Sequence, residues 1–229
     1  MSHTVPIVAI DGPTGSGKGT VSRELARRTG WHLLDSGALY RLVALAAERR
    51  GVSLEDPPVL ARVAGDMDFR FAATADAERI YLDGEDVTAG IRTEPRGRDA
   101  SIVGAMPAVR AALLGRQRDF ARPPGLVADG RDMGSVVFPR ARLKVFLTAE
   151  PGERARRRYK QLKEKGIDVS LAGLSREIIE RDKRDAGRRI APLQPAADAR
   201  VLDSTGLTAN EVVERILSWL REGGIKVAE

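Results

Sequence analysis

The sequence contains no cysteine, which excludes disulfides, thiolate zinc sites and cysteine nucleophiles. It also has no apolar run of about 18 residues, the length that a helix needs to cross a bilayer. The N-terminus has no basic segment followed by an apolar core, so we expect no signal peptide. These absences favour a cytoplasmic protein without a membrane partner.

Aromatic residues are scarce, at 4% of the 229 residues, whereas apolar residues reach an ordinary 42%. This length allows a sizeable core in one domain, with or without an insertion. The net charge of +6 favours polyanionic partners such as nucleotide phosphates or nucleic acid. A basic surface without a specific role explains part of the excess, and few aromatics argue against single-strand binding by stacking.

A glycine-rich stretch joins a predicted strand, 5–11, to a predicted helix that starts near Lys18. The helix is indicated by apolar residues at helical spacing. Glycines let several N–H groups converge on one anion, and the helix N-terminus and Lys18 add positive charge. With Gly-x-x-x-x-Gly-Lys complete and both flanks correct, a phosphate-binding loop is favoured over an ordinary glycine-rich turn. The predicted nucleotide contacts are Gly12, Pro13, Thr14, Gly15, Ser16, Gly17, Lys18, Gly19 and Thr20.

The loop departs from the strict Lys-Ser/Thr form, because Gly19 follows Lys18 and the hydroxyl comes one place later, at Thr20. We expect Thr20 to contribute to a Mg²⁺ site. A second candidate is Asp129, which ends an apolar strand at 126–128, the expected place for the carboxylate on the Mg²⁺ side. A contact through water would suffice.

Strands and helices alternate at the start of the chain, which predicts an α/β protein with a parallel sheet. Ligands of such sheets bind beyond the C-terminal ends of the strands. We therefore expect Asp35, Ser36 and Arg41, after the second strand, to lie near the Lys18 loop. Taken alone, Arg41 is more typical of a solvated surface arginine.

The pattern changes between 68 and 122, where short strands at 69–71, 79–82 and 86–88 precede two helices. Asp83-Gly84 is a tight hairpin signal between two of these strands. We therefore expect a single domain over 1–229 with an inserted subdomain at 63–122.

A densely basic helix begins near Pro151. It predicts a lid, residues 151–188, that closes over a triphosphate, with Arg157 as a nucleotide contact. For most of its basic residues, a solvated face is the favoured interpretation.

The following helix, about 175–188, carries one continuous stripe that begins apolar and turns charged. Its members are Leu174, Ile178, Arg181, Asp185 and Arg188. A stripe that keeps facing inward should line a cleft, where two arginines can hold phosphates while a carboxylate orients them. The alternative is an exposed ladder of ion pairs.

Several of these stretches together resemble the bacterial cytidylate kinases, a family of the nucleoside monophosphate kinases, over essentially the whole chain. The Lys-Gly-Thr order is the usual one in this group. The resemblance implies a three-layer P-loop NTPase-type α/β fold with a five-stranded parallel sheet, an inserted NMP-binding subdomain containing a small antiparallel sheet, and a helical lid. The matching stretches are 11–20, 34–41, 91–92, 128–134 and 181–193.

The resemblance also implies roles for particular residues. It places Ser101, Arg110 and Asp132 on cytosine, and Arg181 and Asp185 on the phosphate and the ribose. A carboxylate such as Asp132 accepts from the N4 amino group of cytosine and repels the carbonyl of uracil. The phosphate of CMP would be held by Arg41, Arg131 and Arg188. The implied catalytic residues are Lys18, Arg131, Arg181 and Arg188.

The predicted reaction is transfer of the γ-phosphoryl group of ATP, with Mg²⁺, to CMP or dCMP, by a monomer without a nucleic-acid partner. One alternative is another small-molecule kinase, acting on UMP, AMP, thymidylate or a sugar. A nucleic-acid-associated ATPase is the alternative from another class. A GTP switch would need an Asn-Lys-x-Asp motif, and the single asparagine, Asn210, precedes Glu211.

Overall fold

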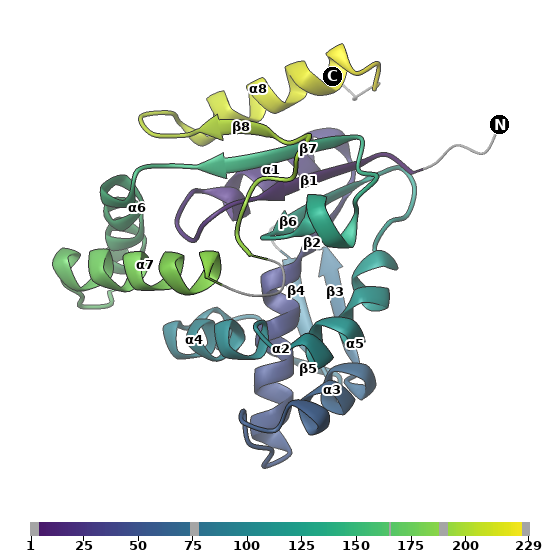
Figure 1. Ribbon diagram of the computed structural model, residues 1–229, viewed down its shortest axis with the longest axis vertical. Coiled ribbons are helices and arrows are strands. Elements are labelled where there is room, and N and C mark those ends of the chain that lie inside the picture. Colours follow the sequence, from purple (N-terminus) through teal and green to yellow (C-terminus); the bar gives the residue numbers. More distant parts are fainter. Residues whose placement is uncertain (1–4, 74–77, 165, 188–191, 226–229) are drawn as a thin grey trace. The chain divides into compact units, whose positions relative to one another are not determined.

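The computed structural model describes residues 5–73, 78–164, 166–187 and 192–225 (Figure 1). The chain forms two compact units, one built from Met1–Leu34 with Phe120–Glu229 and the other from Asp35–Asp119. Within the described ranges, no helix combines the length and the apolar character that a membrane span requires.

The first unit is built on a five-stranded sheet in the order β2-β6-β1-β7-β8. The central strand β1 pairs in parallel with both neighbours, so that Ile10 faces Asp129 on β6 and Val145 on β7. Strands buried on both faces read as near-continuous apolar runs, which is the pattern that predicts them. The bounds are β1 Ile7–Asp11, β2 His32–Asp35, β6 Leu126–Gly130, β7 Leu143–Thr148 and β8 Arg200–Asp203.

Within the described residues, four α-helices accompany this sheet. α1 and α8 pack into its core through apolar side chains that include Val21, Leu25 and Ile216. α6 and α7 pack against each other beyond the C-terminal end of β7 (Figure 1). The Thr-x-x-Glu spacing of Thr208 and Glu211 predicts a capping box, and the two residues form it at the start of α8. The bounds are α1 Lys18–Thr29, α6 Pro151–Glu164, α7 Leu171–Ala186 and α8 Ala209–Glu222.

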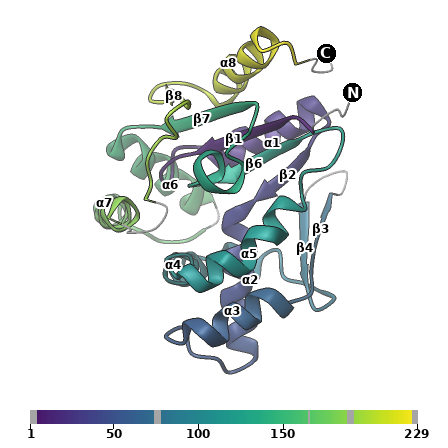
Figure 2. The ribbon, with the colours of Figure 1, turned by 45° about the vertical axis from the view of Figure 1, so that its right-hand side comes forward.

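The second unit combines helices with a separate antiparallel sheet in the order β3-β4-β5, and Figure 2 shows β3 and β4 side by side. The hairpin turn predicted at Asp83-Gly84 joins β4 to β5, with φ of 50° and 83° at the two residues, as such a turn requires. The bounds are α2 Ser36–Arg49, α3 Pro57–Asp66, β3 Phe69–Ala73, β4 Glu78–Leu82, β5 Glu85–Asp86, α4 Glu94–Val103 and α5 Pro107–Arg118.

Capping side chains set the starts of two helices, and the start of α7 differs from the predicted one near 175. α2 follows β2 directly, because the Asp35 carboxylate caps it by accepting from the amide of Ala38, so Arg41 lies in its second turn. α7 begins at Leu171 because the Ser170 side chain caps it. α5 ends at Arg118. The second unit starts at Asp35, and the insert at 63–122 stays a prediction.

Candidate active site

The loop between β1 and α1 has the backbone that its glycines predict. Gly12, Gly15 and Gly17 have φ of 149°, 77° and 93°, values that L side chains rarely adopt. A Cβ on Gly12 would also lie 2.0 Å from the carbonyl oxygen of Leu147. The Lys18 Nζ donates to the carbonyl oxygen of Pro13 at 2.8 Å. The loop therefore folds back over the first turn of α1 and keeps the lysine at its centre.

The ammonium group of Lys18 is the centre of a charged cluster. Burial lowers the pKa of Lys18 to about 8, opposed by the negative charge of Asp129 and reinforced by the positive charge of Arg131. Asp11 and Arg181 act on the same ammonium group. A bound anion would replace the hydration that Lys18 lacks here, so the cluster is suited to phosphate.

The inward stripe of α7 meets this cluster. Leu174 and Ile178 are buried, and Asp185, further along the same face, is fully buried. Asp185 forms an ion pair with Arg131, which follows β6, and its Oδ2 lies 3.9 Å from Nε of Arg181. Asp185 is therefore not part of an exposed ladder of ion pairs. It orients two guanidinium groups beside the phosphate loop.

Oxygen ligands suited to Mg²⁺ lie at the start of α1. Oδ2 of Asp129 lies 3.5 Å from the position that a Cβ on Gly19 would take. Thr20, the next residue, has an exposed side chain. Carboxylate, hydroxyl and phosphate oxygens with water make up the hard-ligand set that Mg²⁺ prefers, so the residues present fit this ion.

Two arginines of α6 contact the phosphate loop. Arg154 donates to the carbonyl oxygen of Thr14 at 3.1 Å and forms a bidentate ion pair with the carboxylate of Asp182 on α7. Arg157 donates to the carbonyl oxygen of Ser16 at 3.3 Å and to the hydroxyl of Ser204 at 2.9 Å. These bonds connect α6, α7 and the loop after β8 to the loop between β1 and α1.

In the second unit, Arg41 projects from α2 toward α4. Its Nη1 donates to the carbonyl oxygen of Ile91 at 2.8 Å, and a Cβ on Gly97 would lie 3.4 Å from its Nη2. Burial lowers the pKa of Arg41, and the charge of Asp35 opposes this. Arg41 is thus a half-buried, oriented cation, and the solvated-surface alternative is wrong.

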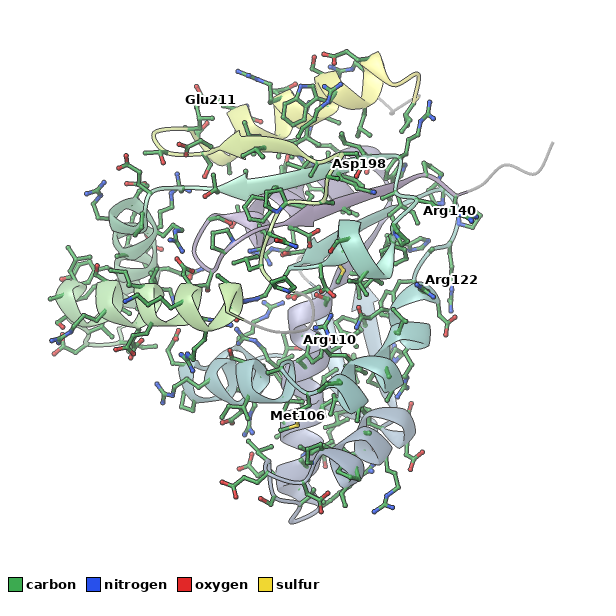
Figure 3. All side chains as sticks on the ribbon, viewed as in Figure 1. Met106, Arg110, Arg122, Arg140, Asp198 and Glu211 are labelled. Carbon is green, nitrogen blue, oxygen red and sulfur yellow. The ribbon has the colours of Figure 1, made fainter. Side chains whose placement is uncertain are left out.

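The other predicted residues of this unit lie on neighbouring helices. Arg110 (labelled in Figure 3) lies on α5 and donates to the Tyr40 hydroxyl and the Gly104 carbonyl oxygen at 3.4 and 3.3 Å. Ser101 is half-buried on α4, one turn before Gly104. Ser36 is buried at the start of α2. Arg110 therefore contacts the turn that follows Ser101.

The predicted residues thus gather within each unit. The first unit brings Lys18, Asp129, Arg131, Arg181 and Asp185 together. The second carries Asp35, Ser36, Arg41, Ser101 and Arg110. Arg188 lies outside the described residues.

Sequence reasoning missed a role for Asp11, the last residue of β1. Its two carboxylate oxygens accept from the amides of Met133 and Gly134 at 2.7 and 2.8 Å, directly after the buried carboxylate Asp132. Burial raises the pKa of Asp11 to about 6, against these two hydrogen bonds. A carboxylate that ends an apolar strand was the available signal, but its partners are more than a hundred residues away.

A parallel sheet whose first strand leads into a glycine loop, a lysine and a helix defines a P-loop nucleotide-binding protein. A family model described as cytidylate kinase matches residues 8–222. The cytidylate kinase of Pseudomonas savastanoi pv. phaseolicola is 59% identical over 227 residues, 98% of this chain and 99% of its own. That of Nitrosococcus oceani is 53% identical over 222 residues, 96% and 98% of the two chains.

The chain belongs to the cytidylate kinase family. Among solved structures, a gluconokinase from Sinorhizobium meliloti 1021 superposes with a TM-score of 0.47 at 15% identity, over 96% of this chain and 93% of its own. That likeness is too low to support an inference about function.

Proposed function

We propose that the protein transfers the γ-phosphoryl group of ATP to CMP or dCMP, giving ADP and CDP or dCDP. The observation that carries the proposal is the gathering of Lys18, Arg131 and Arg181 at a phosphate loop in a chain of the cytidylate kinase family. The cluster combines a mobile ammonium group with guanidinium groups that a buried carboxylate holds in place. Two polyanions can approach each other only where such charge offsets their repulsion.

The proposed step is an in-line displacement at the γ-phosphorus. An oxygen of the CMP phosphate forms the new bond, and the bond from the γ-phosphorus to the bridging oxygen of ADP breaks. The attacking oxygen is already anionic near neutral pH, so the protein needs no strong general base. Lys18 and the loop amides hold the transferred group, while Arg131, Arg181 and Arg188 neutralise charge as it moves.

Mg²⁺, when bound, neutralises charge on the phosphates of the donor. We assign its protein contacts to Thr20 and, through water, to Asp129, which lies against the first turn of α1. Arg157 is assigned to the ATP side, since its guanidinium group reaches the loop carbonyl of Ser16.

The assignments on the acceptor side follow the resemblance to the cytidylate kinase family. We assign cytosine to Asp132, Ser101 and Arg110, and the CMP phosphate to Arg41 together with the arginines named above. Asp185 and Arg181 are assigned to the ribose and phosphate, and Asp35 and Ser36 to the same acceptor. In this proposal, 63–122 is the CMP-binding insert and 151–188 is the lid. Monomeric state and cytoplasmic localisation stay predictions.

The test is a panel of CMP, dCMP, UMP, AMP, thymidylate and a sugar with Mg·ATP and coupled detection of ADP. We expect turnover of CMP and dCMP to exceed that of the other acceptors. A preference for AMP or a sugar would contradict the proposal, and polynucleotide-stimulated hydrolysis that falls with salt would favour the ATPase alternative.

Base recognition is tested separately by Asp132→Asn. The amide can no longer accept two bonds as a carboxylate does, and it can donate to the uracil carbonyl. We expect kcat/KM for CMP to fall about 10- to 100-fold, with a much smaller change for UMP. The matched control is Glu55→Gln, an exposed carboxylate before α3 that lies outside the insert and the lid. Equal losses for CMP and UMP would remove Asp132 from base reading.

A further inference from the structure

We infer that Asp11 is a positioning residue that holds the turn carrying Asp132, and that Lys144 and Asp198 brace the same turn. The inference deepens the proposed function, on which it rests, by naming residues that set the choice of base without touching it. All four side chains belong to the first unit.

The first support is the geometry at Asp11. Its Oδ1 accepts from the Met133 amide at 2.7 Å and its Oδ2 from the Gly134 amide at 2.8 Å. One carboxylate thus binds two successive amides that follow Asp132 directly. Asp11 and Asp132 are both buried, 5% and 3% exposed, so these bonds form away from solvent, where losing them is costly.

The second support is the turn itself. Met133–Val137 forms a π-helical turn, a rare geometry that is frequent at functional sites. The amides of Val136 and Val137 both donate to the Asp132 carbonyl oxygen, at 2.9 and 3.2 Å. The backbone of Asp132 is therefore anchored by the turn, and the start of the turn is anchored by Asp11. If the start of the turn lost these hydrogen bonds, the Asp132 side chain would no longer be held in one orientation.

The third support is a buried lysine packed against the same turn. A Cβ on Gly134 would lie 3.1 Å from both Cγ and Cδ of Lys144, a residue of β7. Lys144 is only 9% exposed, and its Nζ donates to Oδ1 of Asp198 at 2.8 Å. Asp198, labelled in Figure 3, lies in the segment before β8. The ion pair fixes the lysine stem against the glycine, which leaves the turn little room to shift.

Asp11 also acts electrostatically on Lys18, and a role confined to that lysine is the competing explanation. The two explanations differ in what a substitution changes. Loss of the Lys18 interaction would weaken ATP use with every acceptor alike. Loss of the anchored turn would weaken recognition of cytosine in particular.

The experiment compares Asp11→Asn with the control Glu55→Gln, an exposed carboxylate outside the insert and the lid, in steady-state kinetics. The asparagine side chain keeps the shape, but its NH2 group would face one of the two backbone N–H groups, donor against donor. We expect kcat/KM for CMP to fall about tenfold, with UMP and the KM for ATP changing less than about twofold. Equal losses for CMP and UMP, or a loss confined to the KM for ATP, would overturn the inference.

A second variant covers the case in which Asp11→Asn does not fold. Asp198→Asn removes the charge that fixes Lys144 and leaves Asp11 in place, so we expect about a threefold loss for CMP over UMP. If the ratio of kcat/KM for CMP to kcat/KM for UMP is unchanged in this variant, Lys144 and Asp198 do not hold the turn that carries Asp132.

Hydrogen exchange separates failure of this inference from failure of the proposed function. We expect peptides that cover 132–138 to exchange faster in Asp11→Asn than in the wild type or the control. If the wild-type protein phosphorylates no pyrimidine nucleotide, the proposed function fails, and exchange still tests the anchored turn. Unchanged exchange in that segment would contradict it.

Discussion

Replacing Lys18 by methionine should stabilise the protein while it removes the activity. Folding lowers the pKa of this lysine from 10.5 to about 8, chiefly through burial. At about 1.4 kcal/mol for each tenfold change in proton affinity, the buried charge costs about 3 kcal/mol at neutral pH. Methionine removes that cost but also the hydrogen bond to Pro13, worth about 1 kcal/mol. The expected net gain is about 2 kcal/mol.

The pKa shift of Lys18 also predicts how the stability of the wild-type protein changes with pH. Between pH 8 and 10.5 the unfolded chain binds the Lys18 proton and the folded chain does not. The stability of the wild-type protein should therefore rise with pH in this window, because the unfolded state binds more protons. The advantage of Lys18→Met should be complete below pH 8 and should shrink as the pH approaches 10.

Tryptophan fluorescence is a suitable assay, because both tryptophans, Trp31 and Trp219, belong to the first unit. Thermal unfolding at pH 7 should show the Tm of Lys18→Met raised by about 4–8 °C, with kcat lowered at least ~100-fold. Unfolding at pH 10 should show most of the Tm difference gone. A less stable variant, or a difference that does not change with pH, would refute the reasoning.

Three further substitutions test the local packing, each by urea unfolding followed through tryptophan fluorescence. Gly12→Ala should lower the free energy of unfolding by at least about 3 kcal/mol, because the new Cβ would lie 2.0 Å from the Leu147 carbonyl oxygen at a φ of 149°. A loss under about 1 kcal/mol would mean that β7 shifts to accommodate the Cβ. Asp182→Asn should lower the free energy of unfolding by about 2 kcal/mol, because the buried Arg154 keeps only one of its two hydrogen bonds to this side chain. An unchanged urea midpoint would show that this ion pair does not stabilise the protein. Thr208→Ala should cost about 1 kcal/mol by removing the α8 cap, and no loss would show that the cap is redundant.

Local signals account for the parts of the fold that the sequence predicts well. The phosphate loop, the apolar strands and the Thr208 capping box each depend on residues that are neighbours in the chain. The stripe on α7 was also predictable, because helical periodicity alone puts Leu174, Ile178 and Asp185 on one face.

What the sequence could not predict depends on contacts between distant segments. Nothing near Asp11 indicates that its carboxylate would hold Met133 and Gly134. Likewise, the basic helix α6 predicts a solvated face, whereas Arg154 is buried by its bonds to Thr14 and Asp182. Periodicity places a side chain on a face of its own element, but the partner depends on how the elements pack.

The most direct test of the proposed reaction is ³¹P NMR of the protein with ATP, CMP and Mg²⁺. Phosphoryl transfer to the acceptor predicts that the signals of CDP grow in step with those of ADP, while inorganic phosphate stays at background. Formation of ADP and inorganic phosphate with CMP unchanged would contradict the account, because the charged cluster around Lys18 would then serve hydrolysis and not transfer.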